Sequence, residues 1–442
     1  MELKDRKILV VGLGKTGQNT IKFLLSKGAI VKASDSSSIK KLGDIAKELA
    51  SLGVEIEAGT HTDETFLWAQ TIVLSPGVPF SIPQVKKAIN EGIEVISEVE
   101  LAYRFIKTPI IAITGSNGKT TTSTLIAKIL ERNGKRVFLG ANIGTPLIQI
   151  AEDSDKYDIL VLELSSFQLQ GIQSFRPNVA VILNISPNHL DHHESFEEYV
   201  ESKMKIYSNQ KDSDWFVYNK EDEVIAKYLP EVNSQKLPFG KDHLVDGVSF
   251  DGSQIIFRDY SYDIGKTKLL GMHNVENMMA AIAGTTILGC DPVLIQEEID
   301  NFEPLEHRNE YVGLLSGASV YNDSKSTSPA ATLRALESLP HPIILIAGGK
   351  DKGVSFGPLK DLVKEKVRLM VLIGESRFRM KDELGEDVQS RFADTLREAL
   401  EITKENINPE DNVLFSPACS SFDMFNSYED RGAKFKEIVE NL

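Results

Sequence analysis

Residues 109–120 read PIIAITGSNGKT, an apolar run that leads directly into a glycine loop. The run predicts a buried strand, and the pattern after it predicts a helix over residues 121–130. Glycines let backbone N–H groups turn inward around phosphate oxygens, and a helix N-terminus adds partial positive charge. Lys119 suits the β- and γ-phosphates, and the Thr120 hydroxyl suits Mg²⁺. The stretch predicts a nucleotide site, although Ile113 replaces the leading glycine of the usual phosphate loop; an ordinary strand-to-helix turn is the alternative.

Two later strands of the same stretch end in groups that can bind metal ions. Residues 159–162 are apolar and end at Glu163, whose carboxylate suits Mg²⁺ beside a phosphate loop; a solvated strand-end carboxylate is the alternative. Residues 179–183 lead into three histidines, at positions 189, 192 and 193. Zinc is disfavoured because no thiol accompanies them and their spacing fits no familiar zinc motif. We expect one histidine at the nucleotide site and the others at the surface.

The chain alternates strand and helix patterns over three stretches, which indicates an α/β fold with parallel sheets. We place a Rossmann-like domain at residues 1–98, a central P-loop-type ATPase domain at 99–303 and a second Rossmann-like domain at 304–442. Segment 215–269 is rich in short strand-like pieces and predicts a small β-rich insertion in the central domain. The expected strands are 8–11, 30–33, 71–74, 109–113, 159–162 and 179–183, then one near Val320, 343–347, 369–373 and 413–415.

Size and composition fit a protein of several globular domains. At about 150 residues per domain, the 442 residues suggest roughly three. The net charge of −15 disfavours nucleic-acid binding, which needs a basic surface. Cys290 and Cys419 form no metal-binding or disulfide pattern, and no apolar stretch is long enough for a signal peptide or a membrane span. We therefore expect a cytoplasmic protein without membrane insertion.

The first stretch carries a dinucleotide-type fingerprint. Gly12, Gly14 and Gly17 follow strand 8–11, and Asp35 ends the next strand. Taken alone, this pattern would indicate NAD. Physically it requires only that a diphosphate can rest on the helix N-terminus, and a UDP group would do so equally well.

Two polar loops follow strands of the third stretch. Residues 322–327 read NDSKST, and residues 348–352 read GGKDK. Lysines just past strand ends suit carboxylates or phosphates. Either lysine alone is more often a surface residue, but two such loops in one domain favour a binding site.

Together these motifs resemble the Mur ligase family. The run TGSNGKT at residues 114–120 is similar to the family's shortened phosphate loop, which lacks the leading glycine. The resemblance extends from the Gly12 turn to Arg431. The run Asp-Asn-Pro-Arg of the diaminopimelate-adding members is absent. The stretches that resemble the D-glutamate-adding members are LELSSFQL (162–169), GMHN (271–274), NDSK (322–325) and SPACSSFD (416–423).

The resemblance implies roles for individual residues. The catalytic residues would be Lys119, Glu163, His189, Lys203 and Lys325. Two Mg²⁺ ions would be held by Thr120, Glu163, His189 and a carbamylated Lys203. ATP would contact Gly115, Ser116, Asn117, Gly118, Lys119, Thr120, Thr121, Asn274, Asn277, Arg308 and Asp323. The UDP substrate would contact Gly14, Lys15, Thr16, Asp35, Ser36, Ser75 and Asn142. The incoming amino acid would contact Thr327, Lys352, Ser421, Phe422 and Tyr428, where phenylalanine would be expected at the last position.

The activity that the resemblance implies is ATP-dependent amide formation in peptidoglycan precursor synthesis. D-glutamate would be joined to UDP-N-acetylmuramoyl-L-alanine by a cytoplasmic, monomeric ligase, through an acyl phosphate and a tetrahedral intermediate. Three alternatives remain: a related ligase for folate or another amino acid, an NAD-dependent dehydrogenase, and a nucleotide-binding module without ligation chemistry. The UDP-type first domain disfavours a folate ligase, the central phosphate loop and Glu163 would have no role in a dehydrogenase, and the lysine loops of the third stretch disfavour a simple binding module.

Overall fold

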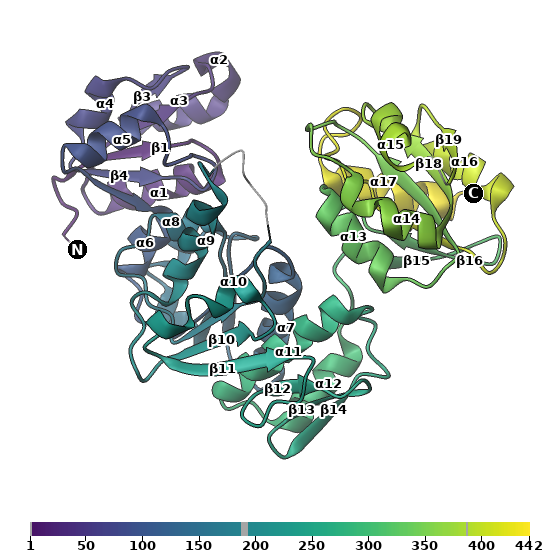
Figure 1. Ribbon diagram of the computed structural model, residues 1–442. Coiled ribbons are helices and arrows are strands. Elements are labelled where there is room, and N and C mark those ends of the chain that lie inside the picture. Colours follow the sequence, from purple (N-terminus) through teal and green to yellow (C-terminus); the bar gives the residue numbers. More distant parts are fainter. Residues whose placement is uncertain (1, 187–192, 386–387) are drawn as a thin grey trace. The chain divides into compact units, whose positions relative to one another are not determined.

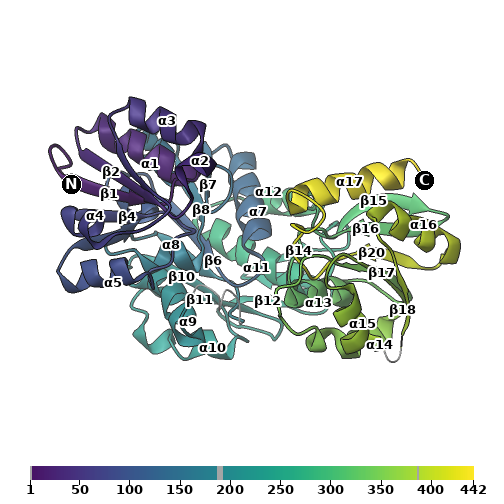
Figure 2. The same ribbon diagram turned by 90° about the horizontal axis from the view of Figure 1, so that it is seen from above.

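The computed structural model describes residues 2–186, 193–385 and 388–442, which form two compact units (Figure 1, Figure 2). The first unit comprises Met1–Lys266 and Glu276–Asp300, and the second comprises Thr267–Val275 and Asn301–Leu442. An N-terminal sheet and a central sheet belong to the first unit, and a third sheet belongs to the second. All are mainly parallel and alternate with helices along the chain, which confirms the predicted α/β fold.

The N-terminal sheet has the strand order β3-β2-β1-β4-β5, and its strands are all parallel. This is a doubly wound arrangement, in which the order reverses beside β1 and leaves a crevice at the carboxyl ends of the strands. The strands are β1 (Lys7–Val11), β2 (Ile30–Asp35), β3 (Glu55–Ala58), β4 (Thr71–Leu74) and β5 (Glu94–Ser97). The helices that connect them are α1 (Lys15–Ser26), α2 (Ile39–Leu42), α3 (Asp44–Ser51), α4 (Asp63–Trp68) and α5 (Pro83–Asn90).

The central sheet has the order β14-β13-β12-β11-β10-β9-β6-β8-β7. The seven strands β7, β8, β6, β9, β10, β11 and β12 are parallel to one another. Strands β13 and β14 are antiparallel to their neighbours. The bounds are β6 (Ile110–Thr114), β7 (Val137–Ala141), β8 (Ile159–Glu163), β9 (Val179–Ile182), β10 (Trp215–Asn219), β11 (Gln235–Gly240), β12 (Val248–Phe250), β13 (Gln254–Phe257) and β14 (Tyr260–Asp263).

The segment 215–269, which was predicted to be a β-rich insertion in the central domain, extends the central sheet. It is rich in strands, as expected, but β10 pairs directly with β9, and β11 to β14 continue the edge of the central sheet. The physical reason is visible in the burial of β10, where Phe216, Val217 and Tyr218 are almost inaccessible to solvent. Apolar residues on both faces of a strand favour a position inside a sheet that is covered on both sides.

The third sheet has the order β15-β16-β20-β17-β18-β19, with β15 antiparallel and the other strands parallel. Its strands are β15 (Glu310–Leu315), β16 (Ala318–Asn322), β17 (Ile343–Gly348), β18 (Val367–Ile373), β19 (Gln389–Phe392) and β20 (Asn412–Phe415). The accompanying helices are α13 (Pro329–Ser338), η5 (Gly357–Leu359), α14 (Lys360–Lys366), α15 (Arg377–Leu384), α16 (Leu396–Asn406) and α17 (Tyr428–Glu440). Strand β17 is buried throughout, in keeping with its unbroken apolar run.

The helices of the central region are α6 (Glu98–Tyr103), α7 (Lys119–Arg132), η1 (Leu147–Ile150), η2 (Ser154–Lys156), α8 (Ser166–Gln170), α9 (Phe196–Met204), η3 (Lys205–Tyr207), α10 (Glu223–Ala226), η4 (Leu229–Glu231), α11 (Met272–Ile287) and α12 (Pro292–Asn301). Within the first unit, α1 and α6 both pack against η1, and a continuous apolar core includes Leu24, Val99 and Leu147. Glu98 is buried at this contact, where its Oε1 accepts a hydrogen bond from the backbone N of Ile148 at 2.7 Å.

In the part of the chain that the structure describes, no helix combines the length and the apolar character needed to cross a lipid bilayer.

Candidate active site

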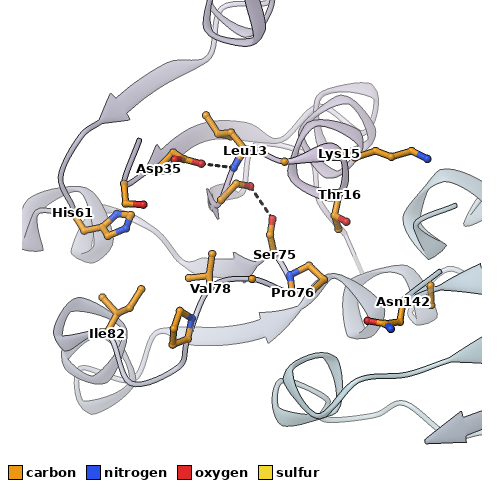
Figure 3. A pocket seen from close by; sticks show the side chains of 16 residues that line it. Leu13, Lys15, Thr16, Asp35, His61, Ser75, Pro76, Val78, Ile82 and Asn142 are labelled. Carbon is orange, nitrogen blue, oxygen red and sulfur yellow. Dashed lines mark hydrogen bonds between the residues drawn. The ribbon is translucent and has the colours of Figure 1, made fainter. Parts of the chain in front are cut away.

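A pocket of about 610 Å³ opens at the carboxyl ends of the N-terminal strands (Figure 3). Ligands of open parallel sheets bind at such ends, beside the point where the strand order reverses. Every residue predicted to contact the UDP substrate lines this pocket: Gly14, Lys15, Thr16, Asp35, Ser36, Ser75 and Asn142. The fold therefore gathers side chains from distant parts of the sequence around one cavity.

The glycine turn after β1 is held in place by side chains from two neighbouring strands. The Asp35 carboxylate accepts hydrogen bonds from the backbone N of Leu13 and of Ser37, both at 2.7 Å, and Ser75 Oγ donates to Gly12 O at 2.8 Å (Figure 3). Gly17 lets α1 approach the turn, because a Cβ there would lie only 1.9 Å from Gly12 O. The N-terminus of α1 is thus fixed at the edge of the pocket, where it favours an anion.

The pocket also receives a loop of the central sheet. Asn142, which follows β7, lies on its wall, and Lys15 Nζ donates to Gly144 O at 3.0 Å. Groups from both sheets of the first unit thus line one pocket.

Sequence reasoning missed His61 and the apolar wall formed by Val78, Pro79 and Ile82. His61 follows β3, a strand that is absent from the sequence-based predictions. The alternation in Glu55–Ala58, ended by Gly59, was the available signal, since it would have placed His61 just past a strand end.

The phosphate loop runs from β6 into α7, as predicted. Gly118 adopts a left-handed conformation (φ +85°), and a Cβ there would lie 2.2 Å from Asn277 Oδ1. Lys119 Nζ folds back to donate to Gly115 O at 2.9 Å and Ser116 O at 3.1 Å. The backbone N of Asn117 donates to Asn184 Oδ1 at 2.9 Å. The amides of the first turn of α7 lack partners inside the helix and are the natural donors to a phosphate.

Several residues predicted to contact the nucleotide have buried side chains in this region, among them Ser116, Thr121 and Asn277. The Thr121 side chain is inaccessible, so we expect its backbone amide to make any phosphate contact. Thr120, beside it at the start of α7, is partly exposed and offers its hydroxyl. Asn277 is also buried, and its Oδ1 accepts a hydrogen bond from Thr122 Oγ1 at 3.2 Å. Asn277 therefore packs directly against the loop, through Thr122 and Gly118.

Glu163 ends β8, next to the phosphate loop on the neighbouring strand β6. Its side chain is buried, and Oε1 accepts a hydrogen bond from Asn142 Nδ2 at 2.7 Å. Oε2 is also buried, and it has no hydrogen-bond partner among the described residues. A buried carboxylate oxygen without a partner is costly, and a bound cation would remove that cost.

Lys203 on α9 is buried beneath the same loop. Its Nζ donates to Gly115 O at 2.9 Å and lies 4.9 Å from the ring centre of Tyr199. Burial, with help from the charge of Lys119, lowers the pKa of Lys203 well below its ordinary value, and Glu163 opposes this only in part. The amine is therefore readily deprotonated, which makes it a nucleophile.

The side chains at this site, Thr120 and Glu163, offer oxygen donors, which suit Mg²⁺ better than a transition metal such as zinc. Within the described ranges, no three His, Cys, Asp or Glu side chains form a group that could hold a metal ion. The Thr120 hydroxyl and the Glu163 carboxylate oxygen without a described partner are hard donors of the kind that Mg²⁺ prefers. His189 lies outside the described residues.

The other predicted nucleotide residues belong to the second unit. Asp323 is buried after β16, where its carboxylate accepts hydrogen bonds from Ser416 Oγ at 2.7 Å and from the backbone N of Asn309 at 3.3 Å. Burial raises the pKa of Asp323 to about 6. Arg308 Nε is buried and has no hydrogen-bond partner in the described part of the chain, and Asn274 Nδ2 donates to Leu270 O at 2.7 Å.

The predicted amino-acid residues lie on loops after β16, β17 and β20, which are neighbours in the third sheet, except Tyr428, which begins α17. The β17 and β20 loops are joined by a hydrogen bond from the backbone N of Lys350 to Ser420 O at 2.9 Å. Lys325 Nζ lies 5.5 Å from the ring centre of Tyr428. The predicted residues include a partly exposed Thr327, an exposed Lys352, a buried Ser421 and Phe422, which is 71% exposed.

Family models match most of the chain. Residues 6–97 match the MurD-like N-terminal domain of Mur ligases, residues 113–285 the Mur ligase middle domain, and residues 307–419 the glutamate ligase domain of Mur ligases. A curated relative from Citrifermentans bemidjiense, named UDP-N-acetylmuramoylalanine--D-glutamate ligase, is 45% identical over 99% of this chain and 98% of its own length.

Solved structures share the fold at lower identity. A pseudomurein peptide ligase type C from Methanothermus fervidus is 19% identical, with a TM-score of 0.62 and 99% of both chains covered. The MurF ligase from Thermotoga maritima in complex with ADP is 18% identical, with a TM-score of 0.62 over 100% of this chain and 96% of that one. The sequence matches and the shared architecture lead to one conclusion: this chain belongs to the Mur ligase family.

Proposed function

We propose that this protein is an ATP-dependent ligase that adds D-glutamate to UDP-N-acetylmuramoyl-L-alanine during peptidoglycan precursor synthesis. The observation that carries the proposal is the pocket on the N-terminal sheet, which gathers every residue predicted for the UDP substrate and reaches Asn142, the hydrogen-bond partner of Glu163. The acceptor and the amino acid are those in the name of the relative from Citrifermentans bemidjiense, 45% identical over 99% of this chain.

The acceptor's diphosphate would rest on the turn from Gly14 to Thr16. The N-terminus of α1 offers free backbone N–H groups there, and Lys15 adds a positive charge. Asp35 and Ser36 would lie toward the uridine, and Asn142 toward the reacting end. This orientation of the acceptor in the pocket is supported by Asn142, which lines the pocket and donates a hydrogen bond to Glu163 beside the phosphate loop.

ATP would bind the phosphate loop, with Lys119 and the first amides of α7 on its phosphates. Asn274 and Asn277 would contact adenine, Arg308 the phosphates and Asp323 the ribose. Thr120, Glu163, His189 and carbamylated Lys203 would hold two Mg²⁺ ions. When bound, these ions offset negative charge on the transferring phosphoryl group and on the substrate carboxylate.

The reaction requires the chain to hold three substrates and exclude water. The acceptor carboxylate oxygen attacks the γ-phosphorus of ATP, releases ADP and becomes an acyl phosphate. The D-glutamate amine then attacks the acyl carbon, and the tetrahedral intermediate expels inorganic phosphate to leave the amide. Lys119 and Lys325 would stabilise charge that builds on the phosphoryl oxygens. Phosphorylation is needed because an unactivated carboxylate is a poor electrophile. Catalysis of both steps rests on positioning and electrostatics.

D-glutamate would lie among the loops after β16, β17 and β20. The two carboxylates of D-glutamate require cationic and hydroxyl donors, which Lys352, Thr327 and Ser421 would supply. Phe422 and Tyr428 would flank the carbon chain of D-glutamate. We further propose that the protein acts in the cytoplasm as a monomer with domains at 1–98, 99–303 and 304–442.

The decisive experiment is a phosphate-release assay with ATP, Mg²⁺ and UDP-N-acetylmuramoyl-L-alanine, repeated over a panel of amino acids. We expect phosphate release only when both the UDP substrate and D-glutamate are present. A preference for L-alanine, L-lysine or diaminopimelate would contradict the proposed amino acid but leave the ligase chemistry intact. Phosphate release that ignores the UDP substrate would contradict the proposed function.

A further inference from the structure

The imidazole of His61 forms the end of the N-terminal pocket beside Asp35, away from Lys15 and Asn142 (Figure 3). Its Nδ1 lies 2.7 Å from Ser34 Oγ. Its ring meets that of Phe66 edge to face at 5.7 Å between centroids, which fixes the plane of the imidazole. Since Ser34 is fully buried on β2, this contact anchors the ring from inside the sheet.

The direction of the Ser34–His61 hydrogen bond follows from Glu57, which faces Ser34 across β2 and β3. Ser34 Oγ lies 2.9 Å from Glu57 Oε2, and the same carboxylate accepts hydrogen bonds from Thr62 and from Thr65 Oγ1. Burial alone would raise the pKa of Glu57, but these hydrogen bonds hold it below its ordinary value. Ser34 Oγ also lies 3.5 Å from Thr60 O. Both this carbonyl and the ionised carboxylate only accept, and the carboxylate is nearer, so Ser34 donates its single proton to Glu57 and not to His61.

The tautomer of His61 is then determined. With its proton committed to Glu57, Ser34 Oγ can only accept from the imidazole, so Nδ1 carries the hydrogen. In the neutral ring the other nitrogen, Nε2, is left with a lone pair. The hydrogen-bonded series Glu57–Ser34–His61 therefore presents a hydrogen-bond acceptor, Nε2, to the pocket. The Glu57 carboxylate, acting through Ser34, determines which ring nitrogen of His61 is this acceptor.

We propose that His61 Nε2 accepts a hydrogen bond from the N3–H of the uracil base, and so selects uridine nucleotides over cytidine nucleotides. The inference rests on the proposed UDP substrate and adds the residue that reads its base. The diphosphate belongs at the opposite end, on the α1 N-terminus, which leaves the His61 end for the nucleoside. Val78, Pro79 and Ile82 supply an apolar wall against which a flat base can lie.

The chemistry of the two pyrimidines gives the selectivity. Uracil carries a hydrogen on N3, whereas N3 of cytosine is an acceptor. A cytosine in the same position would set two lone pairs against each other and leave both groups without a partner. An unsatisfied polar pair of this kind typically lowers affinity by about tenfold to a hundredfold.

The test is calorimetric titration of the full-length protein with UDP, CDP, 3-methyl-UDP and 2′-deoxy-UDP. We expect the wild-type protein to bind UDP at least about tenfold more tightly than CDP or 3-methyl-UDP, and to bind 2′-deoxy-UDP nearly as well as UDP. In His61→Leu the affinity for UDP should fall to the level of the other two. His243→Leu, which removes an exposed histidine that does not line the pocket, is the matched control and should behave like the wild type.

A second measurement addresses the hydrogen-bond network directly. Nitrogen-15 NMR of histidine-labelled wild-type protein should show His61 with its hydrogen on Nδ1, and Ser34→Ala should disturb this signal. A hydrogen on Nε2 in the free protein would overturn the inference, as would an unchanged preference for UDP in His61→Leu or discrimination that follows the 2′-hydroxyl. Failure of the wild-type protein to bind UDP, with binding of NAD in its place, would instead overturn the proposed function.

Discussion

Asn142 holds Glu163 at two points: its side-chain Nδ2 donates to Glu163 Oε1 at 2.7 Å, and its backbone N donates to Glu163 O at 2.9 Å. The same asparagine lines the pocket of the N-terminal sheet. A residue at the N-terminal pocket therefore orients the carboxylate beside the phosphate loop, and the other carboxylate oxygen, Oε2, has no partner among the described residues.

We expect Asn142→Ala to lower kcat and to raise the Mg²⁺ concentration needed for half-maximal rate. A hydrogen bond to a charged group contributes about 1.5–3 kcal/mol, so the effect should be roughly tenfold to a hundredfold. Steady-state kinetics over a Mg²⁺ series measures it. Asn441→Ala, at the exposed end of α17, is the control. An unchanged Mg²⁺ dependence would mean that Glu163 is held well enough by the rest of the fold.

Lys119→Ala should cut turnover by orders of magnitude, because a contact to the γ-phosphate acts mainly in the transition state. The N-terminal pocket does not include Lys119, so binding of the UDP substrate should be nearly unchanged. Turnover and calorimetric titration separate the two effects. Near-normal turnover would contradict the assignment of this loop to ATP.

Lys203 should be carbamylated in the active enzyme. Its neutral amine can add to CO₂ with loss of a proton, and the carbamate that forms places anionic oxygens beside Glu163. Carbon-13 bicarbonate labelling followed by NMR should show the adduct in the wild type and not in Lys203→Ala, whose activity should be lost. Lys205→Ala is the matched control on the adjoining 3-10 helix η3. Full activity in Lys203→Ala would leave the lysine with a purely structural role.

Lys352→Ala should raise the KM for D-glutamate by about tenfold to a hundredfold, since one charge-assisted hydrogen bond to a carboxylate is lost. The KM for ATP should hardly move. Steady-state kinetics with each substrate varied in turn tests this, and Lys360→Ala on the same domain is the control. A selective loss of ATP affinity would assign Lys352 to the nucleotide, and no change in either constant would leave it as a surface residue.

Glu98 should make the stability of the first unit depend on pH. Burial at the contact between α6 and η1 raises the pKa of this carboxyl to about 7, although the backbone amides of Ile148 and Leu147 oppose the change. Between pH 4.5 and about 7 the native state keeps a proton that the unfolded chain releases, so the free energy of unfolding falls as pH rises through that window. Across this window, the raised pKa of Glu98 lowers the free energy of unfolding by roughly 3 kcal/mol.

Urea unfolding at pH 5 and pH 8 measures this dependence. Glu98→Gln should flatten it, because the amide keeps an acceptor for Ile148 and carries no charge at either pH. Glu91→Gln, on the exposed turn after α5, should retain the wild-type dependence. Equal slopes for wild type and Glu98→Gln would show that Glu98 ionises freely in the folded protein.

Much of the architecture followed from local pattern. The apolar runs that became β1, β6, β8 and β17 are each followed by a turn and a helix, and burial on both faces of a parallel strand requires such runs. The segment 215–269 was identified as β-rich, but its place in the central sheet depends on pairing between β9 and β10, which no local pattern specifies. Strand β3 was missed because it is short and only half-buried.

The sequence by itself determined the α/β class, the phosphate loop and the family resemblance, because these depend on residue types at fixed short spacings. Tertiary structure alone decided which distant residues meet. It brought Asn142 to Glu163, and it ordered Glu57, Ser34 and His61 into one hydrogen-bonded chain across β2 and β3. The physical reason is that strand order and register set these contacts, and both are fixed by packing of the whole sheet against its helices.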